Sequence, residues 1–164
     1  MRARLGLLVA GALMILAGCG GGSGGGGSSA TSTSVRPGTA TEDLALLQTI
    51  TADLLASSAL EVEKRIVETD TMRCTGTGTN VDAGRKGDMT LKLKRPAGDV
   101  TASLGKVVSA LRQANDKHFG GRGSLDDQSA PPQGTVHLYA DGFVITVSMS
   151  GSDWSLHASG PCRL

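Results

Sequence analysis

The apolar positions divide the chain into a short apolar leader, a polar tract without a pattern, and a patterned remainder that begins near residue 42. In the remainder, apolar residues first recur at intervals of three and four, which predicts an amphipathic helix over about 42–58. A cap and an acidic first turn are provided by Thr41, Glu42 and Asp43. The apolar stripe of this helix consists of Leu44, Leu47, Ile50, Leu54 and Leu55, with Thr51 at its edge.

A second helix is predicted between two turn signals. It starts after Pro96-Ala97-Gly98, with Asp99 or Thr101 as its cap, and its pattern ends at Gly120-Gly121. We expect residues 120–134, which are polar and contain Pro and Gly, to form a loop. The apolar stripe of the helix is Leu104, Val107, Val108 and Leu111.

The last third of the chain alternates apolar and polar residues in three runs, which predicts a three-stranded meander. The runs are separated by Asp141-Gly142, a strong signal for a two-residue hairpin loop, and by Gly151-Ser152. Two-residue loops place apolar residues opposite one another throughout and all on one face, so that face is expected to be buried. The pairs are Ala140 with Phe143, Leu138 with Ile145, Val136 with Val147, Met149 with Trp154, Val147 with Leu156, and Ile145 with Ala158.

The segment between the two helices predicts further strands. Residues 88–95, "DMTLKLKR", alternate cleanly and indicate a half-buried strand. For residues 60–74 two interpretations stay open, a continued helix or a strand that runs into Cys74, and the β-branched residues favour the strand. Residues 76–87 have the composition of a turn-rich loop.

Together these elements predict an α+β fold. Two helices pack on one face of an antiparallel sheet of about five strands, which ends in the C-terminal three-stranded meander. This single domain is expected over 42–164, after a leader at 1–18 and a tether at 19–41.

The leader predicts export. Two basic residues, Arg2 and Arg4, precede an apolar stretch of 13 residues from Leu5 to Ala17. A helix that crosses a hydrocarbon core of about 30 Å takes about 20 residues, so this stretch is too short to span a membrane. It has the length of the apolar region of a secretory signal peptide.

The leader ends in Leu16-Ala17-Gly18-Cys19, which resembles the lipobox of bacterial lipoprotein signal peptides. The resemblance implies a diacylglyceryl group on the Cys19 thiol, cleavage between Gly18 and Cys19 by a type II signal peptidase, and often an acylated new amino terminus. Two or three acyl chains would hold the protein at the membrane, since a single chain binds only reversibly. The alternative is that Cys19 is the tail of an ordinary signal peptide or a buried thiol.

The tract after Cys19 is expected to be a flexible tether. Residues 20–34, "GGGSGGGGSSATSTS", are a low-complexity Gly/Ser/Thr sequence that cannot form a core. Extended to Thr41, such a tether has a root-mean-square span of roughly 25 Å. With the lipobox and the ending "SGPC", it resembles small lipoproteins of actinobacterial type, which implies a lipid-anchored location on the extracytoplasmic face of the cell membrane and supplies no catalytic residues.

The other two cysteines, Cys74 and Cys162, are predicted to form a disulfide, because they are an even pair in an exported domain. Two free thiols or a metal-binding pair are the alternatives.

The net charge argues against a nucleic-acid partner. Without Arg2 and Arg4, 14 of the 16 basic residues remain against 15 acidic ones, so the mature chain lacks the basic excess of a nucleic-acid-binding protein.

Candidate ligand-binding residues lie on the outer face of the predicted meander. The register places His137 and His157 in one row with Thr146 between them, and Tyr139 and Val144 on the same face. No Cys, Asp or Glu is expected on that row, so a metal site is disfavoured. These four residues, with the 120–134 loop, define a possible recognition surface; an ordinary solvent-exposed sheet face is the simpler interpretation.

The sequence favours a non-catalytic domain that binds a protein or cell-envelope ligand, with no cofactor. A small envelope hydrolase or metal-dependent enzyme is the first alternative, although residues 42–164 contain no Gly-x-Ser-x-Gly nucleophile elbow. A carrier of an apolar ligand between helices and sheet is the second, and it would show a large apolar cavity.

Intact mass spectrometry of the protein purified from its own membrane tests the anchor. We expect a chain that starts at Cys19, carries a diacyl or triacyl increment, and lacks two hydrogens because of the disulfide between Cys74 and Cys162. An unmodified Cys19 would contradict the predicted location.

Overall fold

The computed structural model describes residues 38–75, 83–131 and 133–164, which form two helices and a six-stranded antiparallel sheet. The leader and the cysteine at position 19 lie outside these residues. The helices are α1 (Ala40–Ser58) and α2 (Val100–Phe119). The strands are β1 (Val62–Thr75), β2 (Ala83–Leu93), β3 (Ser124–Asp127), β4 (Gln133–Ala140), β5 (Phe143–Ser150) and β6 (Asp153–Ser159).

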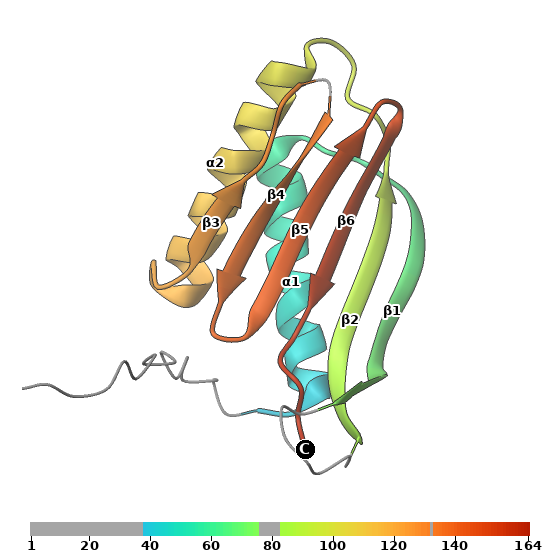
Figure 1. Ribbon diagram of the computed structural model, residues 1–164, viewed down its shortest axis with the longest axis vertical. Coiled ribbons are helices and arrows are strands. Elements are labelled where there is room, and N and C mark those ends of the chain that lie inside the picture. Colours follow the sequence, from blue (N-terminus) through green and yellow to red (C-terminus); the bar gives the residue numbers. More distant parts are fainter. Residues whose placement is uncertain (1–37, 76–82, 132) are drawn as a thin grey trace, which may run out of the picture. The chain divides into compact units, whose positions relative to one another are not determined.

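The strand order is β1-β2-β6-β5-β4-β3, and both helices lie on the same face of the sheet (Figure 1). After the β1–β2 hairpin, α2 carries the chain across to the opposite edge, where β3 begins. The meander β3–β4–β5–β6 then returns to the middle, so that the last strand pairs with β2. The predicted α+β architecture with a C-terminal meander is therefore confirmed.

The caps of both helices follow from local sequence. The cap of α1 is Thr39, two residues before the predicted Thr41, because Thr39 and Glu42 form a capping box. Glu42 N–H donates to Thr39 Oγ1 (3.2 Å) and Thr39 N–H donates to Glu42 Oε2 (2.8 Å). α2 is capped by Asp99, whose Oδ1 accepts from Thr101 N–H at 2.9 Å. It ends at Gly120, whose φ of 60° lies in the left-handed region that favours glycine.

The register of the meander agrees with the prediction at all six apolar pairs. The β4–β5 loop is the expected two-residue turn, with positive φ at Asp141 (50°) and Gly142 (84°). One continuous core forms between sheet and helices, and its largest fully buried side chains include Trp154, Phe119 and Phe143. Of the predicted first-helix stripe, Leu47, Ile50 and Leu54 are fully buried.

Three segments differ from the predicted elements or resolve an open choice. Most of the 60–74 segment lies in strand β1 (Val62–Thr75), which settles the choice between helix and strand. β2 starts at Ala83, so the end of the predicted 76–87 loop is a strand that pairs with the end of β1. The predicted 120–134 loop contains β3, because its four residues find partners along the free edge of β4.

The C-terminal segment is joined to three elements at one end of the domain. Cys162 forms the predicted disulfide with Cys74 at the end of β1, with the two Cα atoms 5.8 Å apart. Arg163 pairs with Arg85 of β2 through two backbone hydrogen bonds of 2.8 Å. Its guanidinium binds the buried Asp43 carboxylate of α1 through both oxygens, at 2.6 and 2.7 Å.

Two glycines of β2 allow this close packing. A Cβ atom at Gly84 would lie 2.5 Å from the Arg163 carbonyl oxygen and 2.7 Å from Cys162 Sγ. A Cβ atom at Gly87 would lie 2.8 Å from the backbone nitrogen of Leu44 in α1. Larger residues at either position would push apart the chain segments that meet there.

Loss of the disulfide should destabilise the domain strongly. The bond closes a loop with a sequence separation of 88, which in the chain-entropy model stabilises the folded state by about 4.6 kcal/mol. We expect the double variant Cys74→Ala/Cys162→Ala to lose about 2–5 kcal/mol of unfolding free energy in guanidinium titrations. Added reductant should lower the stability of the wild type and leave the variant unchanged; equal stability of the two proteins would contradict the prediction.

Candidate functional site

The outer face of the sheet, opposite the helices, carries the candidate residues predicted from the sequence. In the described part of the chain both helices pack on the other side, and Figure 1 views the sheet from this open face. The ladders place His137, Thr146 and His157 side by side on β4, β5 and β6. Tyr139 and Val144 lie opposite each other in the neighbouring row.

His137 and Tyr139 form a stacked pair on β4. Their ring centroids lie 5.5 Å apart with an angle of 24° between the planes. The His137 Nδ1 atom is 2.9 Å from Thr146 Oγ1, so a hydrogen bond to the next strand holds the imidazole in place. Tyr139 is 42% exposed and is one of the few large hydrophobic side chains on the surface of the described residues. These contacts produce an ordered ring platform next to the half-buried Val144.

His157 has a different partner. Its Nε2 atom lies 3.2 Å from Oδ2 of Asp88, and Lys86 Nζ lies 3.5 Å from the same oxygen. The Asp88 side chain is only 5% exposed, so the Lys86 ammonium group compensates a buried carboxylate on the outer face. The pairing of β2 with β6 brings Asp88 to His157.

The expectation that no acidic residue lies on the histidine row is wrong. Asp126 of β3 pairs directly with His137, because the segment predicted as a loop forms an edge strand beside β4. Even so, the described His, Cys, Asp and Glu side chains form no group of three or more that could hold a metal ion. In the described part of the chain, the side-chain hydrogen bonds of the histidines go to Asp53, Thr146 and Asp88, and none joins a serine hydroxyl.

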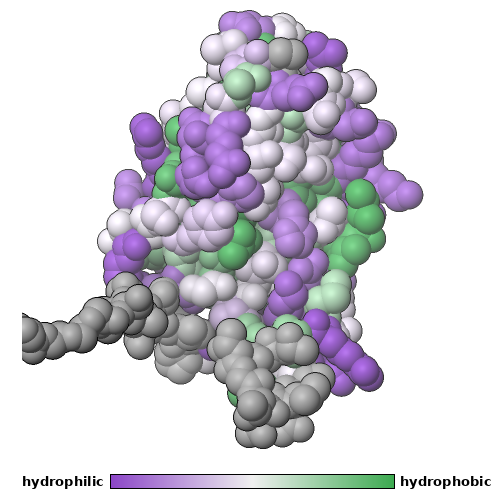
Figure 2. Space-filling view, viewed as in Figure 1, coloured by the Kyte–Doolittle hydropathy of each residue, from purple (hydrophilic) through white to green (hydrophobic). Residues whose placement is uncertain are grey.

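The face as a whole is weakly polar. The hydroxyl residues Ser124 and Thr146 lie opposite Tyr139 and His137 in the ladders, and the charge of Asp88 is balanced by Lys86. Figure 2, viewed from the same side, shows pale side chains over the middle of the sheet with hydrophobic patches among more polar ones. We call the four residues His137, Tyr139, Val144 and His157 the outer-face patch.

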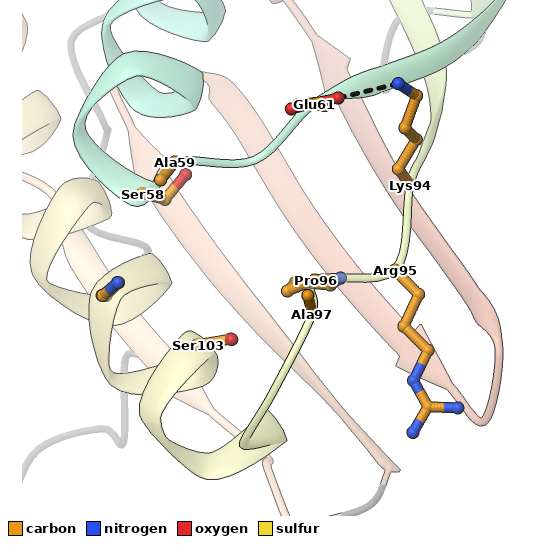
Figure 3. Close-up of a pocket in the computed structure, with 9 residues that line it drawn as sticks. Ser58, Ala59, Glu61, Lys94, Arg95, Pro96, Ala97 and Ser103 are labelled. Carbon is orange, nitrogen blue, oxygen red and sulfur yellow. Dashed lines mark hydrogen bonds and ion pairs between the residues drawn. The ribbon is translucent and has the colours of Figure 1, made fainter.

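A second candidate site, which sequence reasoning missed, is a pocket of about 380 Å³ at the end of the domain where α1 ends and α2 begins. Figure 3 shows its walls: the end of α1 with Ser58, the start of β1 with Glu61, the β2–α2 connection with Lys94 and Arg95, and α2 with Ser103. Lys106 of α2 also lines it. We call it the basic pocket. Its residues come from three separate segments, so no local sequence signal indicates it.

Lys94 and Glu61 form an ion pair across one wall of the basic pocket, with Nζ 2.7 Å from Oε2. The hydrogen bond from Lys94 lowers the pKa of Glu61, and the same bond raises the pKa of Lys94. Glu61 therefore stays ionised further into the acid range than a free glutamate.

His118, which the sequence did not single out, joins the two helices. Its Nε2 atom and Lys117 Nζ each lie 2.7 Å from Oδ2 of Asp53 in α1. The hydrogen bond from Lys117 and then that from His118 lower the pKa of Asp53. This cluster connects α2 to α1, and we assign it a structural role.

Replacing Lys94 should raise the pKa of Glu61. In Lys94→Gln we expect the Glu61 pKa, followed by carboxyl carbon NMR, to rise towards its ordinary value. Because the folded-state pKa of Glu61 is depressed, its contribution to stability is present above the unfolded-state pKa and is lost as the pH falls through the folded value. Lys92→Gln is the matched control, since Lys92 contacts Glu63 instead at 3.2 Å. A Glu61 pKa that is equal in both variants would show that Lys94 is not the cause.

No known family model matches the chain, and no curated protein sequence matches it either. Among solved structures, it is similar to the crystal structure of a DUF4853 family protein from Actinomyces odontolyticus, with 12% sequence identity and a TM-score of 0.49. The likeness covers 79% of this chain and 73% of that one, and at this level it carries no functional argument. Of the described helices, neither combines the length and the apolar character that crossing a membrane requires.

Proposed function

We propose that this protein is a lipid-anchored binding protein on the extracytoplasmic face of the cell membrane, and that it binds a protein partner without altering it chemically. The lipobox pattern around Cys19 and the Gly/Ser/Thr tether after it support the anchor. The disulfide between Cys74 and Cys162 is compatible with an extracytoplasmic location, because such bonds persist in oxidising compartments.

The observation that carries the proposed binding role is the ordered ring pair on the open sheet face. Tyr139 is 42% exposed, stacks on His137, and lies across from Val144, while the hydrogen bond from His137 to Thr146 holds the platform in one arrangement. An exposed aromatic side chain that is already ordered loses little conformational entropy on binding. Tyrosine is also enriched at the centres of protein interfaces.

The weak net charge around the patch favours a protein partner over a highly charged polymer. Lys86 compensates the charge of Asp88, and the hydroxyl groups of Ser124 and Thr146 can hydrogen-bond in either direction. Such a surface matches the mixed apolar and polar composition of non-obligate protein interfaces.

The two alternative functions receive less support from the described residues. A hydrolase or metal enzyme needs clustered catalytic groups, whereas each described histidine has its own separate partner. A carrier of an apolar ligand needs a large apolar cavity, whereas the 380 Å³ pocket is lined largely by charged and hydroxyl side chains.

Site-specific photocrosslinking in cells of the source bacterium tests the proposal. A photoreactive phenylalanine analogue at position 144 of the full-length protein should give one discrete polypeptide adduct. Adding Tyr139→Ala should reduce the adduct about tenfold, as expected for a central aromatic contact. The matched control carries the analogue at position 112, an exposed position on α2, and should not give this adduct.

Each part of the proposal has its own contradicting result. Equal adducts from positions 112 and 144, or an adduct unaffected by Tyr139→Ala, would contradict binding through the outer-face patch. An adduct that contains a glycan and no polypeptide would contradict a protein partner. Cys19→Ser should move the protein from the membrane to the soluble fraction; if this variant stays membrane-bound, the anchor is wrong.

A further inference from the structure

The basic pocket carries an excess of positive charge that the fold itself does not use. Its three cations are Lys94, Arg95 and Lys106, and its one acid, Glu61, is already paired with Lys94. Among the described residues, no ion pair or side-chain hydrogen bond engages Arg95 or Lys106. The pocket therefore has a net charge of +2 in a chain whose overall charge is only +1.

The side chains, and not the helix dipoles, determine the sign of this charge. α1 ends at the pocket and α2 begins there, so the partly negative end of one helix faces the partly positive end of the other. These two contributions oppose each other. An anion at this place would be held by Arg95 and Lys106.

The walls of the pocket are already fixed by backbone contacts. Lys94 N–H donates to the Glu61 carbonyl oxygen at 2.8 Å, which holds the β2–α2 connection against β1. Ser103 Oγ donates to the Asp99 carbonyl oxygen at 3.0 Å within the first turn of α2. Lys106 follows one turn later on the same helix. Two of the pocket's segments are thus ordered without a ligand.

The adjacent Lys94 and Arg95 point in different directions from the β2–α2 connection. Figure 3 shows Lys94 reaching across to Glu61, while Arg95 extends away from Pro96 on the other side of the connection. Arg95 is exposed, and exposed side chains change rotamer within nanoseconds, so its guanidinium can turn towards a bound group. A guanidinium binds phosphate or carboxylate through two parallel hydrogen bonds, and a lysine adds a compact charge.

We propose that the basic pocket binds a small molecule that carries a phosphate monoester. A phosphate monoester bears about −1.5 to −2 charges at pH 7 on one compact group, which matches the two uncompensated cations. The volume of about 380 Å³ lies at the lower end of the range for small-molecule sites, so the ligand is small. The same phosphate chemistry occurs on soluble metabolites and on the headgroup of phosphatidic acid. The site shares no residue with the outer-face patch, so it goes beyond the proposed function and can fail independently of it.

Calorimetric titration of the full-length protein tests the site. The probes are glycerol 3-phosphate, glycerol as its uncharged counterpart, and vesicles that contain phosphatidic acid compared with vesicles of phosphatidylcholine alone. We expect saturable binding of glycerol 3-phosphate and none of glycerol. The double variant Arg95→Gln/Lys106→Gln should weaken binding at least about tenfold, since charge-assisted contacts to an anion are lost.

The matched control removes the same number of positive charges elsewhere on the surface. Lys64→Gln/Arg112→Gln replaces exposed residues of β1 and α2 and should change the affinity less than about twofold, since distant exposed charges are largely screened by salt. Circular dichroism of both double variants checks that they are folded.

The possible outcomes distinguish a soluble phosphate ligand from a lipid headgroup and from no phosphate site. Binding of glycerol 3-phosphate that is lost only in the pocket variant supports a soluble ligand. Binding only to phosphatidic acid vesicles, with the same dependence on Arg95 and Lys106, supports the same chemistry on a lipid headgroup. Binding to neither probe, or an equal loss in both double variants, overturns the proposal.

Discussion

The pairing of β6 with β2 is the interaction on which the rest of the structure depends. The chain makes two local units, the β1–β2 hairpin and the β3–β6 meander, and only this ladder joins them into one sheet. Its register places Leu91 opposite Leu156 and Leu93 opposite Trp154, so the apolar faces of the two units become continuous. Both helices then cover a single surface. Without the ladder, each unit would expose an apolar face too small to form a stable core.

Elements whose structure depends on nearby residues were predicted from the sequence, and elements that depend on distant parts of the chain were not. The pairing of β4, β5 and β6 was predicted because two-residue loops such as Asp141-Gly142 set the register of neighbouring strands. β3 was missed because it has one apolar residue, Leu125, and no strand pattern of its own. Its existence depends on the free edge of β4, which lies several residues further along the chain.

The candidate sites, too, could be predicted only where they depend on neighbouring strands. The row of His137, Thr146 and His157 could be worked out from alternation within the meander, and the ladders confirm it. Asp88 and Asp126, the acidic neighbours of the two histidines, could not be placed without the order of all six strands. The basic pocket could not be predicted either, because its residues come together only where the end of α1, the start of β1, the β2–α2 connection and the first turns of α2 meet.

The contacts of the C-terminal segment have a mechanical consequence. Asp43 in the first turn of α1 is bound by Arg163, and the neighbouring Cys162 is bonded to β1. If the protein is anchored through the residues before α1, as proposed above, a pull on a bound partner enters the domain at the start of α1. The force then passes through a bidentate ion pair and a covalent bond into the sheet, and does not peel the helix from its first turn. These contacts therefore brace the first turn of α1 against a pull from its N-terminal side.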